Sequence, residues 1–155
     1  MAAESIETDE VIKSLSGKIL RYPTRYTIQL SETKHVEIKN GAEFLNHSCE
    51  PNACIMVDEK TDWITIRALK PILVESDICF NYNTTEWDME ESFLCQCEKC
   101  RTKSERTLVQ GAKHLAWENV VDILPHATPI ILRKLTQKWG AAVIAEKVRV
   151  PGTHH

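Results

Sequence analysis

Residues 46–52 read NHSCEPN and are the most informative seven residues of this 155-residue chain. Taken alone, they predict a turn, because asparagine side chains bond to nearby backbone groups and proline fixes its own φ. Many sequences satisfy such a turn, so a turn does not account for this order of residues. Cys49 is a candidate metal ligand, because three more cysteines lie close together later in the chain.

Three of the six cysteines lie close together as C-x-C-x-x-C over residues 95–100. An irregular loop can wrap three such thiolates around one ion, and a structural zinc requires four ligands in a closed tetrahedral site. The fourth ligand must come from elsewhere, and Cys49 is the natural candidate because it lies in another unusual stretch. The spacing therefore predicts one structural zinc ion with four ligands: Cys49, Cys95, Cys97 and Cys100.

Other roles for these cysteines fit the sequence less well. Cys97 and Cys100 have the spacing of a redox pair, but no βαβ pattern precedes them. Arg101 follows them where a haem attachment signal requires histidine. The residues between the cysteines are polar, which disfavours a cluster of core thiols, and exposed free thiols would oxidise. Cys54 and Cys79 lie in apolar strand patterns and are expected to be small buried hydrophobic residues.

The first two thirds of the chain have the alternating pattern of short strands. Five strands are predicted, at 26–30, 36–38, 53–57, 63–69 and 78–82. Polar turns at 31–34 and 58–62 join the first four into two hairpins. Strands this short, with polar turns between them, favour a compact β fold over alternating βα units.

The last third changes to a helical period. Leu108, Ala112 and Leu115 recur at helical spacing, and Pro125 closes that segment. Thr128-Pro129 has the pattern of a cap followed by proline at the first helical position, so a second helix is expected to start there. We interpret both as amphipathic helices that serve packing.

Composition excludes several classes of protein. A hydrophobic fraction of 43% and a charged fraction of 26% are ordinary for a globular domain. The net charge of −3 and the pI near 6.1 argue against direct nucleic-acid binding. No apolar run approaches the ~18 residues that span a membrane, and residues 1–11 lack the features of a secretory signal. We expect an intracellular protein, in the nucleus or the cytoplasm, with its cysteines reduced.

With these features in place, residues 46–52 resemble the NHSCxPN signature of the SET family of protein-lysine methyltransferases. Residues 77–82, DICFNY, are similar to the family's strand that ends in a tyrosine. The cysteine cluster is similar to its post-SET zinc segment, in which the fourth ligand is the cysteine of NHSC. The resemblance covers roughly residues 4–106 and implies the same four ligands that zinc chemistry predicts.

The resemblance implies a mainly β fold with α. It consists of a SET-type β-clip of short strands with a pseudoknot, a post-SET zinc loop and two C-terminal helices. The expected domains are a SET domain at 1–90, a zinc segment at 91–106 and a helical extension at 107–148. The family's GxG segment is absent, so the SET domain is expected to be short at its N-terminus. The YxGE element has its best counterpart at 15–18, with leucine in place of tyrosine.

The resemblance also assigns roles to individual residues. Asn46 would bind S-adenosylmethionine through its side chain, and His47 would contact the adenine chiefly through its backbone. Tyr82 would lie beside the reacting centre, where its phenol would orient the methyl group or stabilise the surroundings of the sulfonium. Either Phe93 or Trp87 would stack on the adenine. The implied partner is a protein that presents a lysine, whether histone or other, with no nucleic acid and no membrane involved.

Methyl transfer to lysine requires the neutral amine. Because the reference pKa of lysine is ~10.4, the site must lower it through desolvation and the nearby sulfonium. A narrow aromatic channel does this and also aligns the reacting atoms. Two other functions stay open from the sequence: a catalytically weak, SET-derived protein-binding module, and a structural domain stabilised by zinc.

Overall fold

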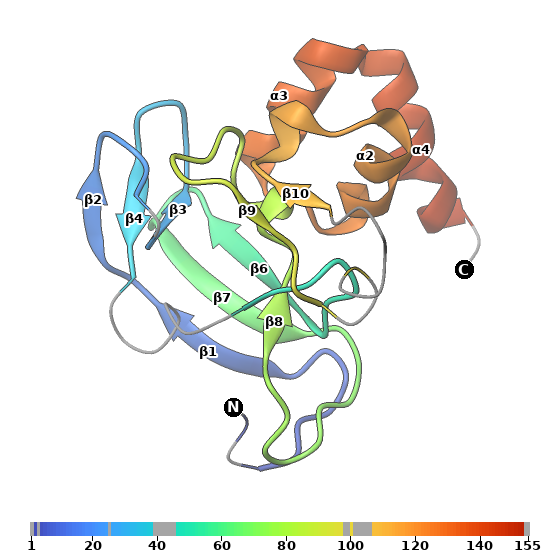
Figure 1. Cartoon of the computed structure of the whole chain (residues 1–155). Coiled ribbons are helices and arrows are strands. Elements are labelled where there is room, and N and C mark those ends of the chain that lie inside the picture. Colours follow the sequence, from blue (N-terminus) through green and yellow to red (C-terminus); the bar gives the residue numbers. More distant parts are fainter. Residues whose placement is uncertain are drawn as a thin grey trace.

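The computed structural model describes residues 2, 4–24, 26–38, 46–97, 100 and 107–153, with side chains to residue 148. Short strands occupy the first two thirds of the chain and helices most of the last third (Figure 1). The strands are β1 (Val11–Leu15), β2 (Lys18–Leu20), β3 (Thr27–Gln29), β4 (His35–Glu37), β5 (Asn46–His47), β6 (Ala53–Asp58), β7 (Trp63–Ala68), β8 (Cys79–Phe80), β9 (Phe93–Leu94) and β10 (Leu108–Val109). The α-helices are α2 (Trp117–Ile123), α3 (Pro129–Trp139) and α4 (Ala141–Thr153), and the 3₁₀ helices are η2 (Tyr82–Thr84), η3 (Ala112–His114) and η4 (Leu124–His126). The predicted fold class, mainly β with C-terminal helices, is confirmed.

Within the described residues, the strands form four small sheets. One has the antiparallel order β1-β7-β6 and a second the order β2-β4-β3, while β5 pairs with β8 and β9 with β10. Both predicted hairpins are present: β6 and β7 pair from Ala53↔Ala68 to Asp58↔Trp63, and β3 pairs with β4. Along β7, Ile64 and Ile66 are buried and Trp63 is exposed. This alternation fixes the register, because a slip of one residue would expose the apolar set.

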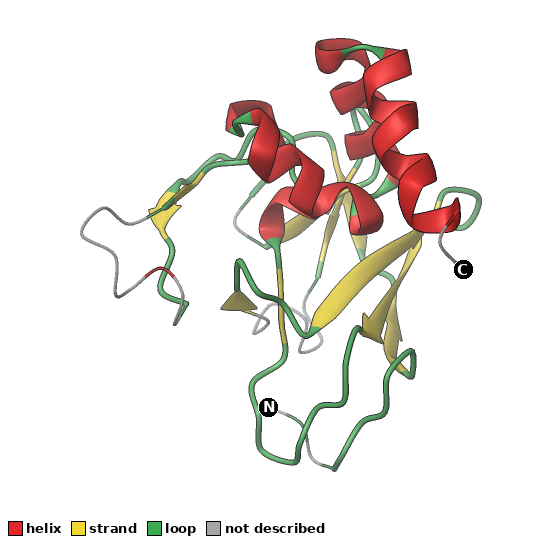
Figure 2. Ribbon diagram, turned by 90° about the vertical axis from the view of Figure 1, so that its right-hand side faces the viewer, coloured by secondary structure: helices red, strands yellow, loops and turns green. Residues whose placement is uncertain are grey.

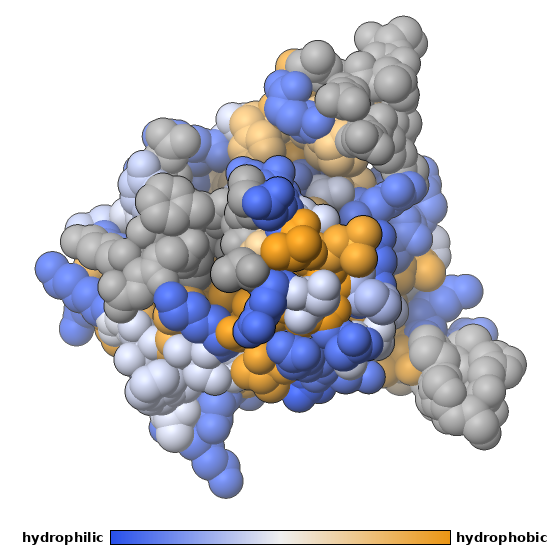
Figure 3. Space-filling model, turned by 90° about the horizontal axis from the view of Figure 1, so that it is seen from below, coloured by the Kyte–Doolittle hydropathy of each residue, from blue (hydrophilic) through white to orange (hydrophobic). Residues whose placement is uncertain are grey.

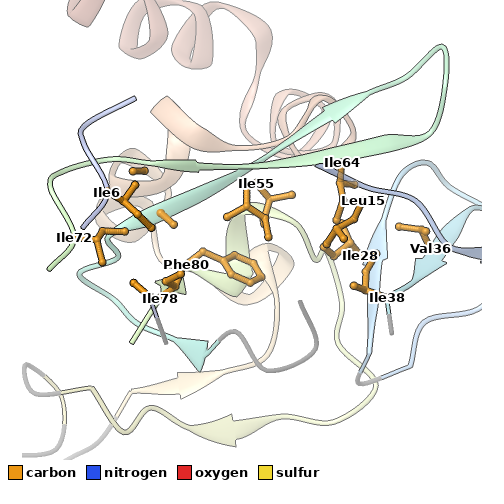
Figure 4. Close-up of a cluster of buried hydrophobic side chains, with 14 of the residues drawn as sticks. Ile6, Leu15, Ile28, Val36, Ile38, Ile55, Ile64, Ile72, Ile78 and Phe80 are labelled. Carbon is orange, nitrogen blue, oxygen red and sulfur yellow. The ribbon is translucent and has the colours of Figure 1, made fainter. Parts of the chain in front are cut away.

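The main core lies between these sheets. Apolar side chains from several strands point toward one another there (Figure 4). Val36 and Ile64 are fully buried, and Phe80 brings β8 into the same cluster. The site-bearing strand β8 is therefore fixed by hydrophobic burial, the dominant favourable contribution to folding.

The helices pack around a second core and cover one side of the strands (Figure 2). Val120, Ile131 and Leu135 are fully buried in it. Of the two predicted helices, the segment that ends at Pro125 contains α2 and the segment after Thr128 forms α3, whereas α4 was not predicted. Among the described residues, no helix is both long and apolar enough to cross a membrane.

The helical prediction for Leu108 was wrong. Leu108 lies in β10 and pairs with Leu94 of β9. Backbone pairing across the cysteine segment therefore overrides the local helical spacing of apolar residues.

Backbone hydrogen bonds fasten the helical part to the segment after Tyr82. Ala112 N–H donates to the Glu86 carbonyl at 2.9 Å. Thr128 donates twice to the Thr84 carbonyl, from its N–H at 2.9 Å and from its buried hydroxyl at 3.1 Å. These hydrogen bonds hold the residues that follow β8 against the C-terminal helical part.

Gly111 is required at this junction, and replacing it with alanine is expected to destabilise the chain. Its φ is +107°, and a Cβ there would lie 2.4 Å from the carbonyl oxygen of Trp87. Strained backbone of this kind costs about 1–3 kcal/mol, and the clash with backbone adds to it. Urea unfolding of Gly111→Ala should therefore show a loss of at least about 2 kcal/mol.

Gly140 provides a matched control for that substitution. Its φ is +109°, but nothing lies within 4 Å of a Cβ built there. Gly140→Ala therefore carries the backbone strain without the clash. Equal losses in the two variants would show that Gly111 is not needed for close packing against Trp87.

The lower face of the molecule has a mixed surface. Apolar residues there are bordered by hydrophilic ones (Figure 3). The chain has several large exposed apolar side chains, including Val11, Leu73 and Val74. Single exposed apolar residues are ordinary on protein surfaces.

Candidate functional site

The site is built on the parallel pair β5 and β8. Asn46 pairs with Cys79 and His47 with Phe80, and the Ser48 N–H donates to the Phe80 carbonyl at 3.1 Å. This pairing brings together two segments that are more than 30 residues apart in sequence. The segment that carries Asn46 and the segment that leads to Tyr82 therefore lie side by side.

Asn52, the last residue of the NHSCEPN stretch, fixes this arrangement. Its side-chain amide donates to the Asp77 carbonyl at 2.8 Å and accepts from the Cys79 N–H at 2.9 Å. Its own N–H donates to the Cys79 carbonyl at 3.2 Å. Sequence reasoning gave Asn52 no role, although its place in the stretch was a usable signal.

His47 lies at the centre of an aromatic group. It is 8% exposed, and its Nδ1 accepts the backbone N–H of Tyr82 at 3.0 Å. Its ring contacts Tyr82 and Phe93 edge-on, with centroids 5.3 and 5.8 Å away. Burial lowers the pKa of His47 to about 4, so the ring is neutral at physiological pH.

A cleft of about 780 Å³ opens beside this group. Four of the residues predicted to bind the cofactor or to act on it line the cleft: Asn46, His47, Tyr82 and Phe93. Its volume lies within the range of roughly 300–1,000 Å³ that is typical of small-molecule sites. The cleft is therefore large enough for a nucleoside-sized ligand.

Trp87 lies elsewhere and is not among the described residues that line the cleft. Its ring packs against the helical core, with the Lys134 ammonium 5.6 Å from the ring centroid. Its backbone N–H donates to the Gln29 side chain at 3.1 Å. Of the two aromatic candidates, Phe93 alone faces the cleft, because the helical extension offers the indole a more apolar environment. Phe93 is therefore the one of the two that is placed to contact a ligand in the cleft.

The cysteine cluster assembles as predicted. The four sulfur atoms lie within 4.8 Å of one another: those of Cys49, Cys95, Cys97 and Cys100. Cys49 Sγ is 3.6 Å from Cys95 Sγ and 3.5 Å from Cys100 Sγ. Tetrahedral zinc with Zn–S bonds of ~2.3 Å places its sulfurs ~3.8 Å apart. Both the donor set and the spacing fit a structural zinc ion.

The acidities of these thiols fit a cation site as well. Burial, followed by hydrogen bonds with its neighbours, raises the pKa of Cys49, and burial raises that of Cys95. Burial would also raise the pKa of Cys97, but a hydrogen bond from the backbone of Cys49 and others within the cluster lower it to about 6. Four crowded thiols resist ionisation together unless a cation compensates their charge.

Glu86 is a buried acid in the wall of the cleft that sequence reasoning missed. Its carboxylate accepts the Gln29 N–H at 3.2 Å, and burial raises its pKa to about 8 against hydrogen bonds from Thr85 and Gln29. Among the described residues, no cation is paired with it. Glu86 is therefore mostly protonated and uncharged at neutral pH.

The cleft as a whole favours a cationic ligand. Besides the uncharged Glu86, the described residues that line it include three acids, Asp77, Glu90 and Glu91, and neither lysine nor arginine. Asp77, Glu90 and Glu91 are exposed. Acidic groups of one sign in a cleft raise the local concentration of positively charged ligands.

Comparison with known proteins agrees with this geometry. Residues 1–83 match the family model of the SET domain. Methyltransferase flvH of Aspergillus flavus is 30% identical over 74 residues, which are 48% of this chain and 40% of that protein. Histone-lysine N-methyltransferase SET5 of Saccharomyces cerevisiae is 30% identical over 76 residues, 43% of this chain and 14% of that protein. The chain thus spans 40% or less of the length of these relatives.

A solved structure shares the fold. The structure of KRYPTONITE in complex with mCHG DNA and SAH has a TM-score of 0.53 and 19% sequence identity, and the match covers 67% of this chain and 25% of that one. At this identity the similarity concerns the fold alone. The family model covers more than half of the sequence, so the chain belongs to the SET domain family.

Proposed function

We propose that this chain transfers methyl groups from S-adenosylmethionine to lysine side chains of a protein, histone or other. The observation that carries this proposal is that Asn46, His47, Tyr82 and Phe93 line the same cleft. It is supported by relatives that are named methyltransferases.

Within this proposal the residues of β5 and β9 bind the cofactor. The exposed side chain of Asn46 and the backbone of His47 contact it from one wall, and Phe93 stacks on its adenine. When bound, the cofactor supplies an electrophilic methyl group on a positively charged sulfur. Tyr82, held by the hydrogen bond to His47, orients that group toward the substrate.

The acids of the cleft act on the incoming lysine. Asp77, Glu90 and Glu91 attract its ammonium to the opening. Deeper in, desolvation and the positive sulfur favour the neutral amine. The protonated Glu86 carboxyl, with its pKa near 8, adds no negative charge that would hold the ammonium form.

The metal and the domain organisation complete the proposal. Cys49, Cys95, Cys97 and Cys100 hold one structural zinc ion. We keep the boundaries 1–90, 91–106 and 107–148 for the SET domain, the zinc segment and the helical extension. Residues 98–99 and 101–106 of the zinc segment lie outside the described residues. Action inside the cell, in the nucleus or the cytoplasm, stays a prediction.

Tyr82→Phe tests this function. Without the phenol oxygen, labelled methyl transfer to proteins of a mixed extract should fall at least roughly tenfold, the low end for a group that acts in the transition state. Cofactor binding, measured by calorimetry, should change little. Tyr22→Phe, which removes the hydroxyl of a tyrosine that is 61% exposed, is the matched control. If the unmodified chain neither labels protein nor binds cofactor at millimolar concentration, the protein-binding module becomes the better account.

A further inference from the structure

The side chain of His47 lies between the metal ligands and the residue proposed to act on the methyl group. Its Nε2 is 3.6 Å from the Cys49 sulfur. Its Nδ1 is 3.0 Å from the backbone nitrogen of Tyr82. One buried ring therefore contacts both a proposed metal ligand and the backbone of Tyr82.

The hydrogen bond to Tyr82 fixes the position of the ring proton. A backbone N–H can only donate, so Nδ1 must present its lone pair to Tyr82. The proton of the neutral ring is then on Nε2, the atom that faces the Cys49 sulfur. A thiolate bound to a metal accepts such a hydrogen bond, which tunes and orients the ligand.

The ring has little freedom to move. It is 8% exposed and lies edge-on against both Tyr82 and Phe93. The backbone on either side of the ring is also tied to β8: His47 pairs with Phe80, and the Ser48 N–H donates to the Phe80 carbonyl. A displacement of Cys49 is therefore passed to Tyr82 rather than absorbed by rotation of the ring.

We propose that His47 is a positioning residue that couples the zinc centre to Tyr82 through the two nitrogens of its ring. This inference rests on the proposed function for the importance of Tyr82. The coupling itself is a property of contacts within the chain. Zinc bound to Cys49 fixes the ring through Nε2, and the ring fixes the backbone of Tyr82 through Nδ1.

Two substitutions separate the two contacts. In His47→Asn the amide oxygen takes the place of Nδ1 and keeps the acceptor for the Tyr82 N–H, but the donor to Cys49 is lost. In His47→Gln the amide nitrogen takes the place of Nε2 and keeps the donor, but the acceptor is lost. Each variant thus retains one half of the bridge.

Starting from the zinc-loaded chain, each variant is expected to change mainly one of two measured properties, zinc affinity or exchange of the Tyr82 amide hydrogen. Zinc affinity, from competition with a colorimetric chelator, should fall about ten- to one-hundredfold in His47→Asn and much less in His47→Gln. Exchange of the Tyr82 amide hydrogen, followed by NMR, should speed up roughly five- to tenfold in His47→Gln and less in His47→Asn. His35→Gln, at a buried histidine of β4, gives the general cost of such a replacement.

Parallel changes in both variants would overturn the coupling, because they would show that the ring serves packing alone. Unchanged zinc affinity and amide exchange in both variants would overturn it too, as would an unmodified chain that retains no zinc. None of these measurements requires methyl transfer. A failure of the proposed function is therefore distinguishable from a failure of this inference.

Discussion

Cys49→Ser is expected to lower the zinc content of the purified chain from about one ion per molecule, the stoichiometry of a single tetrahedral site, to a small fraction. Among the four proposed ligands, Cys49 is the most distant in sequence, 46 residues before Cys95. It joins the cysteine segment to the turn after β5, so its loss opens the site and frees that segment. Zinc can be measured by atomic emission and the freed segment by hydrogen exchange in β9 and β10.

The effect on stability should be large. Structural zinc in small peptides has apparent binding free energies of about 10–16 kcal/mol, whereas whole domains are stable by about 5–15 kcal/mol. Even half of that binding energy would be a large share of the total. For a domain of this size, a loss of about 5 kcal/mol lowers the melting temperature by roughly 10–20 °C.

Cys54→Ser is the matched control for the cysteine variant. Cys54 is a buried cysteine of β6 outside the cluster, so the same atom is exchanged without touching the proposed ligands. It should keep its zinc and lose only the modest stability that a buried hydroxyl costs. The zinc assignment would fail if single serine variants at Cys49, Cys95, Cys97 and Cys100 all kept the full zinc content.

The sequence predicted those parts of the molecule whose chemistry restricts local residue identity. Alternating apolar residues predicted the β6–β7 hairpin, because a two-residue period is typical of a half-buried strand. The spacing of the cysteines predicted their clustering, because few roles besides a metal site place three thiols within six residues of a polar segment. Both predictions depend on features that are local in the sequence.

Residues whose surroundings come from distant parts of the chain are harder to predict. Leu108 has helical spacing but pairs with β9. The sequence left Phe93 and Trp87 as alternatives for stacking, and only the fold shows that the Trp87 ring packs against the helical core. A side chain's partner across the fold decides such positions, and periodicity carries no information about it. Glu86 was missed for the same reason, because nothing local marks a carboxyl that will be buried.

That buried carboxyl has a consequence for the dependence of stability on pH. Burial raises the pKa of Glu86 from an ordinary 4.5 to about 8 in the folded chain. The folded state therefore holds its proton at pH values where the unfolded state has lost it. The stability contributed by the protonated group is complete below about pH 4.5 and is lost as the pH rises toward 8.

Glu86→Gln should remove this loss, because the amide imitates the protonated acid and keeps an oxygen for the Gln29 N–H. Between pH 5 and 8 the unfolding free energy of the unmodified chain should fall, relative to the variant, by on the order of 3 kcal/mol. Urea unfolding of both proteins with zinc present measures this difference in unfolding free energy. The titration of the cysteines is the same in both proteins and cancels in the difference. Glu91→Gln makes the same exchange at an exposed site and should follow the unmodified chain. If the curves of Glu86→Gln and the unmodified chain ran parallel from pH 5 to 8, Glu86 would have to be ionised in the folded state, and the cleft would hold one more negative charge.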